Sequence, residues 1–127
     1  MIKKMREWSN SCWPTEIRIE AEGEVLRVSF DDGNEYALSA ELLRVESPSA
    51  EVQGHGIGQK ITISGKRLVR ILGVEQVGNY AIKITFNDLH DTGIYTWKYL
   101  HELGENQEKI WEDYFERLLV EGLGRDP

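Results

Sequence analysis

The chain has 127 residues, 40% of them hydrophobic and 29% charged, which is the composition of a folded protein with one hydrophobic core. Its formal net charge is −7, from 22 acidic and 15 basic residues, and this balance opposes binding to nucleic acid or to anionic lipid. No run of apolar residues approaches the roughly 18 that a membrane-spanning helix needs. We therefore expect neither nucleic acid nor a membrane as a partner.

The first residues predict a cytoplasmic protein with a short leader. The basic residues near the start are followed by polar residues, so they do not begin a signal peptide. The single cysteine, Cys12, cannot close an internal disulfide and cannot hold zinc alone, which favours a reducing compartment. Trp13-Pro14 favours an extended backbone. We expect a flexible leader over residues 1–14 and one domain over residues 15–124.

The first half of the domain alternates apolar and polar residues in a way that predicts three short strands. These strands are expected at residues 16–20, 25–30 and 35–38. Glycine-containing turns separate them, so they should form an antiparallel meander. Ser39 follows as the predicted N-cap of a short helix over residues 40–44.

A loop is predicted over residues 47–58. It contains Pro48 and three glycines at alternate positions, which favour irregular structure. A phosphate-binding loop would need glycine directly before Lys60 and serine or threonine directly after it, and neither is present. Because long loops in small domains often carry function, this segment is a candidate binding region.

The second half of the chain predicts two further strands and two helices. One strand is expected at residues 68–72, continuing beyond a bulge at Gly73, and another at residues 80–86. A short helix over residues 95–103 should stop at Gly104. The final helix should end at Gly122 and bury the residues that fall at helical spacing, namely Ile110, Trp111, Tyr114, Phe115, Leu118 and Leu119. We predict an α+β domain in which an antiparallel sheet of five to six strands is covered on one face by helices, the last of them an amphipathic C-terminal helix.

A polar turn over residues 87–93 lies where the predicted strand at residues 80–86 passes into the following helix. It contains Asp88, His90 and Asp91. One interpretation gives these side chains a binding role. The other gives them a structural role, with the aspartates bonded to the turn backbone and His90 half-buried beside Trp97.

No residue pattern predicts a catalytic centre. Nucleophilic catalysis needs an activated Ser, Cys or Thr, and the candidates here are scattered without a strained elbow. None of the three histidines begins the His-x-Asp/Glu step of an iron oxygenase. We therefore predict no catalytic residues and no enzyme activity, while a weak metal site made by His55, His90 and Asp91 stays open.

Three blocks of the sequence together resemble a known family. They are LRVESPSAEVQGHG at residues 43–56, VEQVGNYA at residues 74–81 and HDTGIY at residues 90–95. In this order they resemble the small bacterial proteins of unknown function that are grouped as gamma-butyrobetaine hydroxylase-like N-terminal domains. The resemblance covers about residues 15 to 121, and it identifies a family rather than a function.

The resemblance also carries an expectation about zinc. In gamma-butyrobetaine hydroxylase and its trimethyllysine-hydroxylating relative, this domain binds a structural zinc through a Cys-x-Cys-x-x-Cys cluster and a later histidine. The three cysteine positions fall here on Ser47, Ser49 and Val52, while His90 matches the histidine. A hydroxyl is a poor zinc ligand and valine is none, so we expect no zinc and no other cofactor. The oxygenase domain that holds iron and 2-oxoglutarate in that family is absent from this sequence.

Two functional hypotheses remain from the sequence. The first is a non-catalytic accessory module that binds a protein partner. A link to iron–sulfur protein biogenesis is implied because similar domains are fused in plants to Mrp-type ATPases that carry iron–sulfur clusters. The second is a weak iron- or zinc-binding protein that uses His90 and its neighbours, and a small enzyme ranks behind both. The predicted binding surface consists of Ser47, Ser49, Glu51, His55, Asp88, His90 and Asp91.

Overall fold

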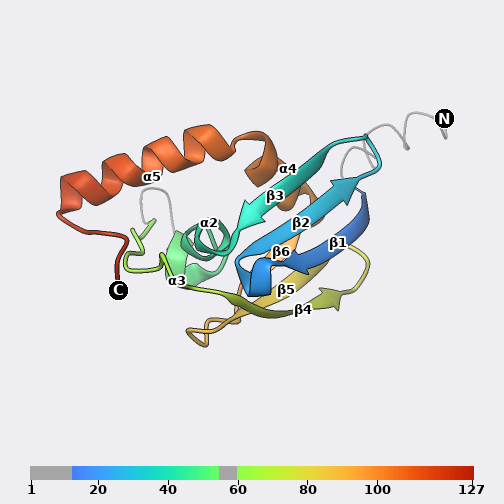
Figure 1. Ribbon diagram of the computed structural model, residues 1–127, viewed down its shortest axis with the longest axis horizontal. Coiled ribbons are helices and arrows are strands. Elements are labelled where there is room, and N and C mark those ends of the chain that lie inside the picture. The colour runs from blue at the N-terminus through green and yellow to red at the C-terminus, as the bar shows by residue number, and fades with distance from the viewer. Residues whose placement is uncertain (1–12, 55–59) are drawn as a thin grey trace.

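The structure is a computed structural model that describes residues 13–54 and 60–127 (Figure 1). Its strands form two antiparallel sheets of three strands each, ordered β1-β2-β3 and β4-β5-β6. Strands that are neighbours in the sequence are therefore neighbours in each sheet. The strands are β1 (Pro14–Glu20), β2 (Val25–Phe30), β3 (Glu35–Ser39), β4 (Ile71–Val77), β5 (Ala81–Phe86) and β6 (Ile94–Thr96).

Four α-helices among the described residues connect and cover the sheets. They are α2 (Ala40–Val45), α3 (Ala50–Gln53), α4 (Trp97–Glu105) and α5 (Gln107–Glu121), and a short 3-10 turn, η2 (Ala21–Gly23), joins β1 to β2. The predicted N-cap is confirmed, because the Ser39 hydroxyl accepts a hydrogen bond from the Leu42 N–H at 3.0 Å. Gly122 ends α5 as predicted, with a left-handed φ of 69°.

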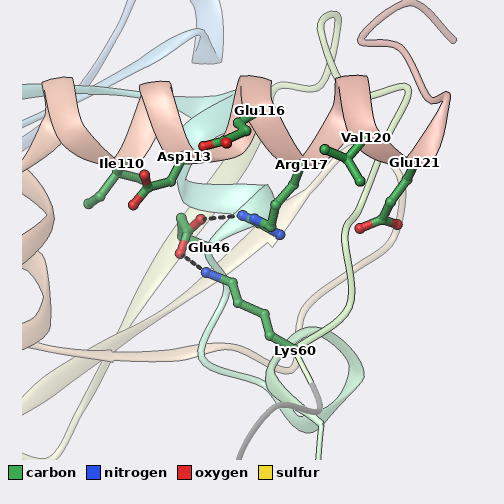
Figure 2. Close-up of a pocket in the computed structure, with 8 residues that line it drawn as sticks. All are labelled: Glu46, Lys60, Ile110, Asp113, Glu116, Arg117, Val120 and Glu121. Atoms are coloured by element: carbon green, nitrogen blue, oxygen red, sulfur yellow. Dashed lines mark hydrogen bonds and ion pairs between the residues drawn. The ribbon is translucent and has the colours of Figure 1, made fainter.

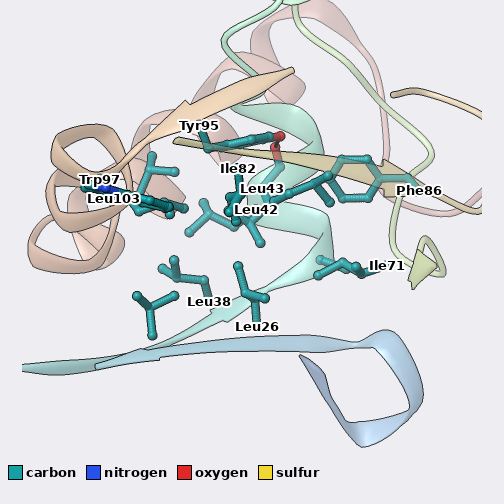
Figure 3. Packing of buried hydrophobic residues seen from close by; sticks show 14 of the residues in the cluster. Leu26, Leu38, Leu42, Leu43, Ile71, Ile82, Phe86, Tyr95, Trp97 and Leu103 are labelled. Atoms are coloured by element: carbon teal, nitrogen blue, oxygen red, sulfur yellow. Dashed lines mark hydrogen bonds between the residues drawn. The ribbon is translucent and has the colours of Figure 1, made fainter. Parts of the chain in front are cut away.

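The core lies between the two sheets and α2. Figure 3 shows Leu26 and Leu38 of the first sheet facing Ile82 and Tyr95 of the second, with Leu42 of α2 among them. All five side chains are buried. Each sheet thus removes one apolar face from water by packing against the other, which is the main stabilising term for a domain of this size.

The C-terminal helix has a smaller core of its own. Tyr114 and Leu118 are buried against Val45 of α2, with Ile63 and Trp111 packed around them. Phe115 and Leu119, which helical spacing placed in the core, are instead exposed. The helix buries one narrow side, so only part of its apolar residues is covered.

Two sequence predictions about the sheet are wrong. The six strands form two sheets rather than one, and residues 95 and 96, expected to be helical, belong to β6. Alternation identifies the buried face of each strand, but strands of one sheet and strands of two facing sheets alternate in the same way. The helix α4 does not stop at Gly104 but continues to Glu105. The glycine is needed for packing instead, since a Cβ at this position would lie 2.3 Å from the ring of Tyr36.

The ends of the domain differ slightly from the prediction. Pro14 already belongs to β1, and the carbonyl of Trp13 accepts a hydrogen bond from the Asp31 N–H at 2.9 Å. Within the predicted loop, residues 50–53 form the short helix α3. The rest of the expected leader, residues 1–12, lies outside the described residues. Across the part of the chain that the structure describes, no helix is both long and apolar enough to cross a membrane.

Candidate functional site

The polar turn between β5 and β6 is held by its own hydrogen bonds. The Phe86 N–H donates to the His90 carbonyl at 3.0 Å, and the Leu89 N–H donates to the Phe86 carbonyl at 2.9 Å. Asp88 Oδ1 accepts from the His90 N–H at 3.1 Å, as the structural interpretation expected. Leu89 takes a left-handed φ of 73°, unusual for a residue with a side chain, and its side chain is exposed. This turn fixes the direction in which the His90 ring points.

The His90 ring lies between two residues of the segment that follows α2. Its Nε2 atom is 2.9 Å from the Ser47 hydroxyl, and its Nδ1 atom is 2.9 Å from Oε1 of Glu51. Ser49 contributes a longer contact, 3.4 Å from its hydroxyl to Nε2. The fold therefore brings together residues about 40 positions apart, and we call Ser47, Ser49, Glu51 and His90 the His90 cluster.

The protonation state of His90 follows from its surroundings. Burial lowers the pKa of His90, and the Arg44 guanidinium lowers it further, although Glu51 and Asp88 offset part of this effect. The imidazole is therefore neutral at pH 7. Because the carboxylate of Glu51 can only accept, Nδ1 carries the proton and Nε2 accepts a hydrogen bond from the Ser47 hydroxyl.

A second charged group anchors the same turn from the other side. Oδ2 of Asp88 is 2.8 Å from Nε of Arg44 and 2.7 Å from Nζ of Lys66. Burial would raise the pKa of Asp88, but the hydrogen bonds from Lys66, Arg44 and the His90 N–H outweigh it and lower the pKa to about 2. Nη1 of Arg44 is buried and has no hydrogen-bond partner among the described residues. Asp88 thus ties the turn to α2 and to the segment before β4.

The order Ser47, His90 and Glu51 has the hydrogen bonds of a serine, histidine and acid triad. Catalysis would also need a substrate to reach the serine. Ser47 has no exposed surface, and a Cβ placed on Gly93 would lie 2.5 Å from its hydroxyl, so neighbouring backbone covers the oxygen. The side chain of His90 is 2% exposed. Among the described residues, Ser47 and His90 are therefore closed off from solvent, and only the Glu51 side chain of this arrangement is exposed.

The structure separates the predicted site residues into three groups. Ser47, Ser49, Glu51, Asp88 and His90 come together, and Ser47, Ser49 and His90 are buried rather than on the surface.

Two predicted site residues remain. Asp91 is exposed, and His55 lies outside the described residues. His90 packs against Phe86, with ring centroids 6.1 Å apart, while Trp97 instead donates from its indole to the Asn79 carbonyl.

Sequence reasoning missed Arg44, Lys66 and Gly93. The two cations belong to segments whose charges looked like ordinary solvent-facing residues, and Gly93 looked like a simple turn glycine. An unpaired aspartate at a strand end was the only available signal, and it did not identify its partners. Contacts across such long stretches of chain depend on how the two sheets pack.

Ser47, Ser49 and His90, three of the four residues aligned with the family's zinc ligands, come together, but the side chains at the cysteine positions do not fit zinc. Ser47 and Ser49 point at Nε2 of His90, where a zinc ligand set would meet. Their hydroxyls and the alkyl side chain of Val52 replace the thiolates, so three of the four donors are unsuited to zinc. Within residues 13–54 and 60–127, no group of three His, Cys, Asp or Glu side chains has the arrangement of a metal site. In the structure, Ser47, Ser49 and Glu51 all contact the ring nitrogens of His90.

A groove of about 470 Å³ lies beside α5, away from the His90 cluster (Figure 2). One wall is the helix surface around Arg117 and Val120, and the other is the chain that begins at Lys60. Glu46 lies at its base, where its carboxylate contacts Nζ of Lys60 at 2.6 Å and Nη2 of Arg117 at 3.3 Å. The groove is open to solvent, unlike the His90 cluster.

Comparisons with known proteins place the chain in a family. A family profile described as "Gamma-butyrobetaine hydroxylase-like, N-terminal" matches residues 17–101. A search of curated proteins finds no significant match. Two solution NMR structures are 43% and 44% identical, with TM-scores of 0.78 and 0.80; the alignments cover 90% and 94% of this chain and 90% and 89% of the other chains.

A crystal structure from Acidithiobacillus ferrooxidans extends the comparison. It is described as a protein with unknown function of the DUF971 family, is 37% identical and has a TM-score of 0.62. The alignment covers 75% of this chain and 96% of that chain. The profile match spans most of the chain, and it contains the second half of β1, all of β2 to β6 and the His90 cluster. The chain therefore belongs to the family of gamma-butyrobetaine hydroxylase-like N-terminal domains.

Proposed function

We propose that this protein is a non-catalytic accessory module that binds another protein. One observation carries the non-catalytic part: both ring nitrogens of His90 and the hydroxyl of Ser47 are engaged in internal hydrogen bonds, and both side chains are buried. A catalytic group must reach its substrate. The His90 cluster instead braces the turn before β6 against the segment after α2.

The surface supports the binding part of the proposal. Three large apolar side chains are mostly exposed to solvent: Leu89 and Leu119 are each 82% exposed, and Val120 is 77% exposed. Leu119 and Val120 are neighbours on α5, and Val120 lines the open groove beside this helix, while Leu89 lies in the turn between β5 and β6. Exposed apolar side chains beside an open groove are typical of protein interaction sites. The family resemblance makes proteins of iron–sulfur biogenesis the first partners to test.

The structural role of the His90 cluster, which we call the brace, is tested by substituting His90→Ala and Ser47→Ala in the purified protein. Loss of the buried hydrogen bonds should lower the free energy of unfolding in urea by about 2–4 kcal/mol for His90→Ala and about 1–2 kcal/mol for Ser47→Ala. Asp91→Ala, in the same turn but exposed, should change it by less than about 0.5 kcal/mol. Stoichiometric iron or zinc in the native protein that disappears in a folded His90→Ala variant would refute the brace and favour metal handling.

Partner binding is tested by photo-crosslinking in the native cell. A photoreactive phenylalanine analogue replaces Leu89, Leu119 or Val120, one at a time, and Lys98 of α4 serves as the exposed control. A discrete crosslinked protein at one or more of the apolar positions, absent at Lys98, is expected. No discrete product at any of the three positions would contradict the proposal.

A further inference from the structure

We infer that the groove beside α5 binds a basic, partly apolar segment of a partner protein. This inference rests on the proposed function and names the surface and the chemistry of the partner. The groove measures about 470 Å³, enough for a few side chains of an extended peptide or one helix turn. Figure 2 shows its residues projecting from α5 toward Glu46 and Lys60.

Hydrogen bonds within the protein hold the walls of the groove in place. The Thr62 hydroxyl donates to Glu121 at 2.6 Å and accepts from Nη1 of Arg117 at 3.2 Å. The Tyr114 hydroxyl donates to the Ile63 carbonyl at 2.7 Å. These bonds hold residues 60–63 beside α5, so binding does not have to order the wall first.

The base of the groove cannot attract an anion strongly. Glu46 has a side chain that is 7% exposed, and it contacts both cations of the groove, Lys60 and Arg117. A buried carboxylate of this kind holds its cations in place, since separating them would leave a charge unpaired. Glu46 cancels one of these two positive charges, so the base keeps a formal charge of +1, which the three carboxylates of Asp113, Glu116 and Glu121 outweigh.

The rim of the groove is acidic and apolar. Asp113, Glu116 and Glu121 line it, while Lys109 pairs with Asp113 outside the groove at 3.1 Å. Val120 lies on the same side of the helix and is mostly exposed. A segment that combines lysine or arginine with aliphatic residues complements both features, because its cations face the rim carboxylates while its apolar side chains cover Val120.

Charge also argues against a second copy of this chain as the occupant. α5 carries five acidic residues and two basic ones, a formal charge of −3. A two-fold interface along this helix would place two such surfaces against each other. Like charges across an interface disfavour association, whereas a basic segment of another protein turns the same charges into attraction.

Binding is measured by fluorescence anisotropy with a short labelled peptide of alternating lysine and leucine residues. The matched probe carries glutamate in place of each lysine. We expect the wild-type protein to bind the lysine peptide and not the glutamate peptide. Backbone NMR shifts of Ile110 and Val120 should change on titration, because both residues line the groove.

Two charge reversals on the same helix separate a specific groove from general attraction. Glu116→Lys changes the rim, while Glu112→Lys makes the same change at an exposed position that does not line the groove. We expect Glu116→Lys to lower the affinity for the lysine peptide by about tenfold and Glu112→Lys to lower it by less than about threefold. NMR spectra of both variants check that they remain folded.

Three outcomes would overturn the inference. The first is that Glu112→Lys and Glu116→Lys lower the affinity for the lysine peptide equally, which would mean that the peptide is attracted to the acidic protein as a whole. The second is binding without shifts at Ile110 and Val120, and the third is a wild-type dimer, seen by sedimentation, that Glu116→Lys dissociates. Crosslinking at Leu89 to a partner would still support the proposed function in each case, so the two failures are distinguishable.

Discussion

Asp88 gives the sharpest test of how the turn before β6 is held. The substitution Asp88→Asn keeps the size of the side chain and the acceptor for the His90 N–H, but it removes the negative charge that faces Arg44 and Lys66. Arg44 is 11% exposed, so little water is available to replace the carboxylate. The variant is therefore left with a nearly buried cation that has lost its partner.

The size of the effect follows from the pKa of Asp88. The pKa falls from 3.8 to about 2 on folding, a shift that corresponds to about 2 kcal/mol at 25 °C. This shift already includes the lost attraction to Arg44 and Lys66, but the asparagine amide N–H₂ would also face these two donors, so we expect Asp88→Asn to lose about 2–4 kcal/mol of unfolding free energy at pH 7. Asp91→Asn makes the same chemical change at an exposed position of the turn and should lose less than about 0.5 kcal/mol.

The loss should also depend on pH in one direction. A carboxyl group with a lowered folded pKa stabilises the protein fully above its unfolded pKa and loses that effect as the pH falls toward the folded pKa. The difference between wild type and Asp88→Asn, measured by urea unfolding, should be constant above about pH 5 and shrink between about pH 4 and pH 2. A difference that stays constant down to pH 3, or a loss no larger than that of Asp91→Asn, would refute the reasoning.

Two further predictions concern the histidine and the helix packing. The lowered pKa of His90 means that the unfolded chain binds a proton first, so wild-type stability should fall as the pH drops below about 6.5. His90→Gln should flatten this part of the curve, and an unchanged slope in urea titrations would contradict the assignment. Gly104→Ala would place a Cβ 2.3 Å from the Tyr36 ring and should lower the free energy of unfolding, measured by thermal unfolding, by about 1–3 kcal/mol. Gly73→Ala, which has open space around it, should leave the stability nearly unchanged. Equal effects of the two substitutions would argue against this packing.

Local features of the fold were readable from the sequence because they depend on neighbouring residues. The N-cap at Ser39, the helix stop at Gly122 and the strands β2 and β5 follow from the side chains within a few positions. The register shift at the start of β4, between Ile71 and Gly73, is also close to the bulge expected there. These features would form in the same places under many tertiary arrangements.

The candidate site was predicted only in part. The sequence and the family resemblance singled out Ser47, Ser49, Glu51 and His90, and the structure brings these four residues together. Their exposure was not readable, because a serine in a polar segment and a serine buried under Gly93 have the same neighbours in the chain. Three of the six described residues of the expected polar surface, Ser47, Ser49 and His90, are therefore buried, while Glu51 and Asp91 are exposed.

The sequence by itself determined the residue types that meet at the His90 cluster, including the two hydroxyls that stand where the family has thiolates. It also determined most of the strands and helices. Only the tertiary structure decided that the six strands form two facing sheets, that Asp88 pairs with Arg44 and Lys66, and that α5 forms a groove with the chain around Thr62. Such contacts join segments far apart in the chain, and they exist only once burial of two apolar faces has fixed how the sheets and helices pack.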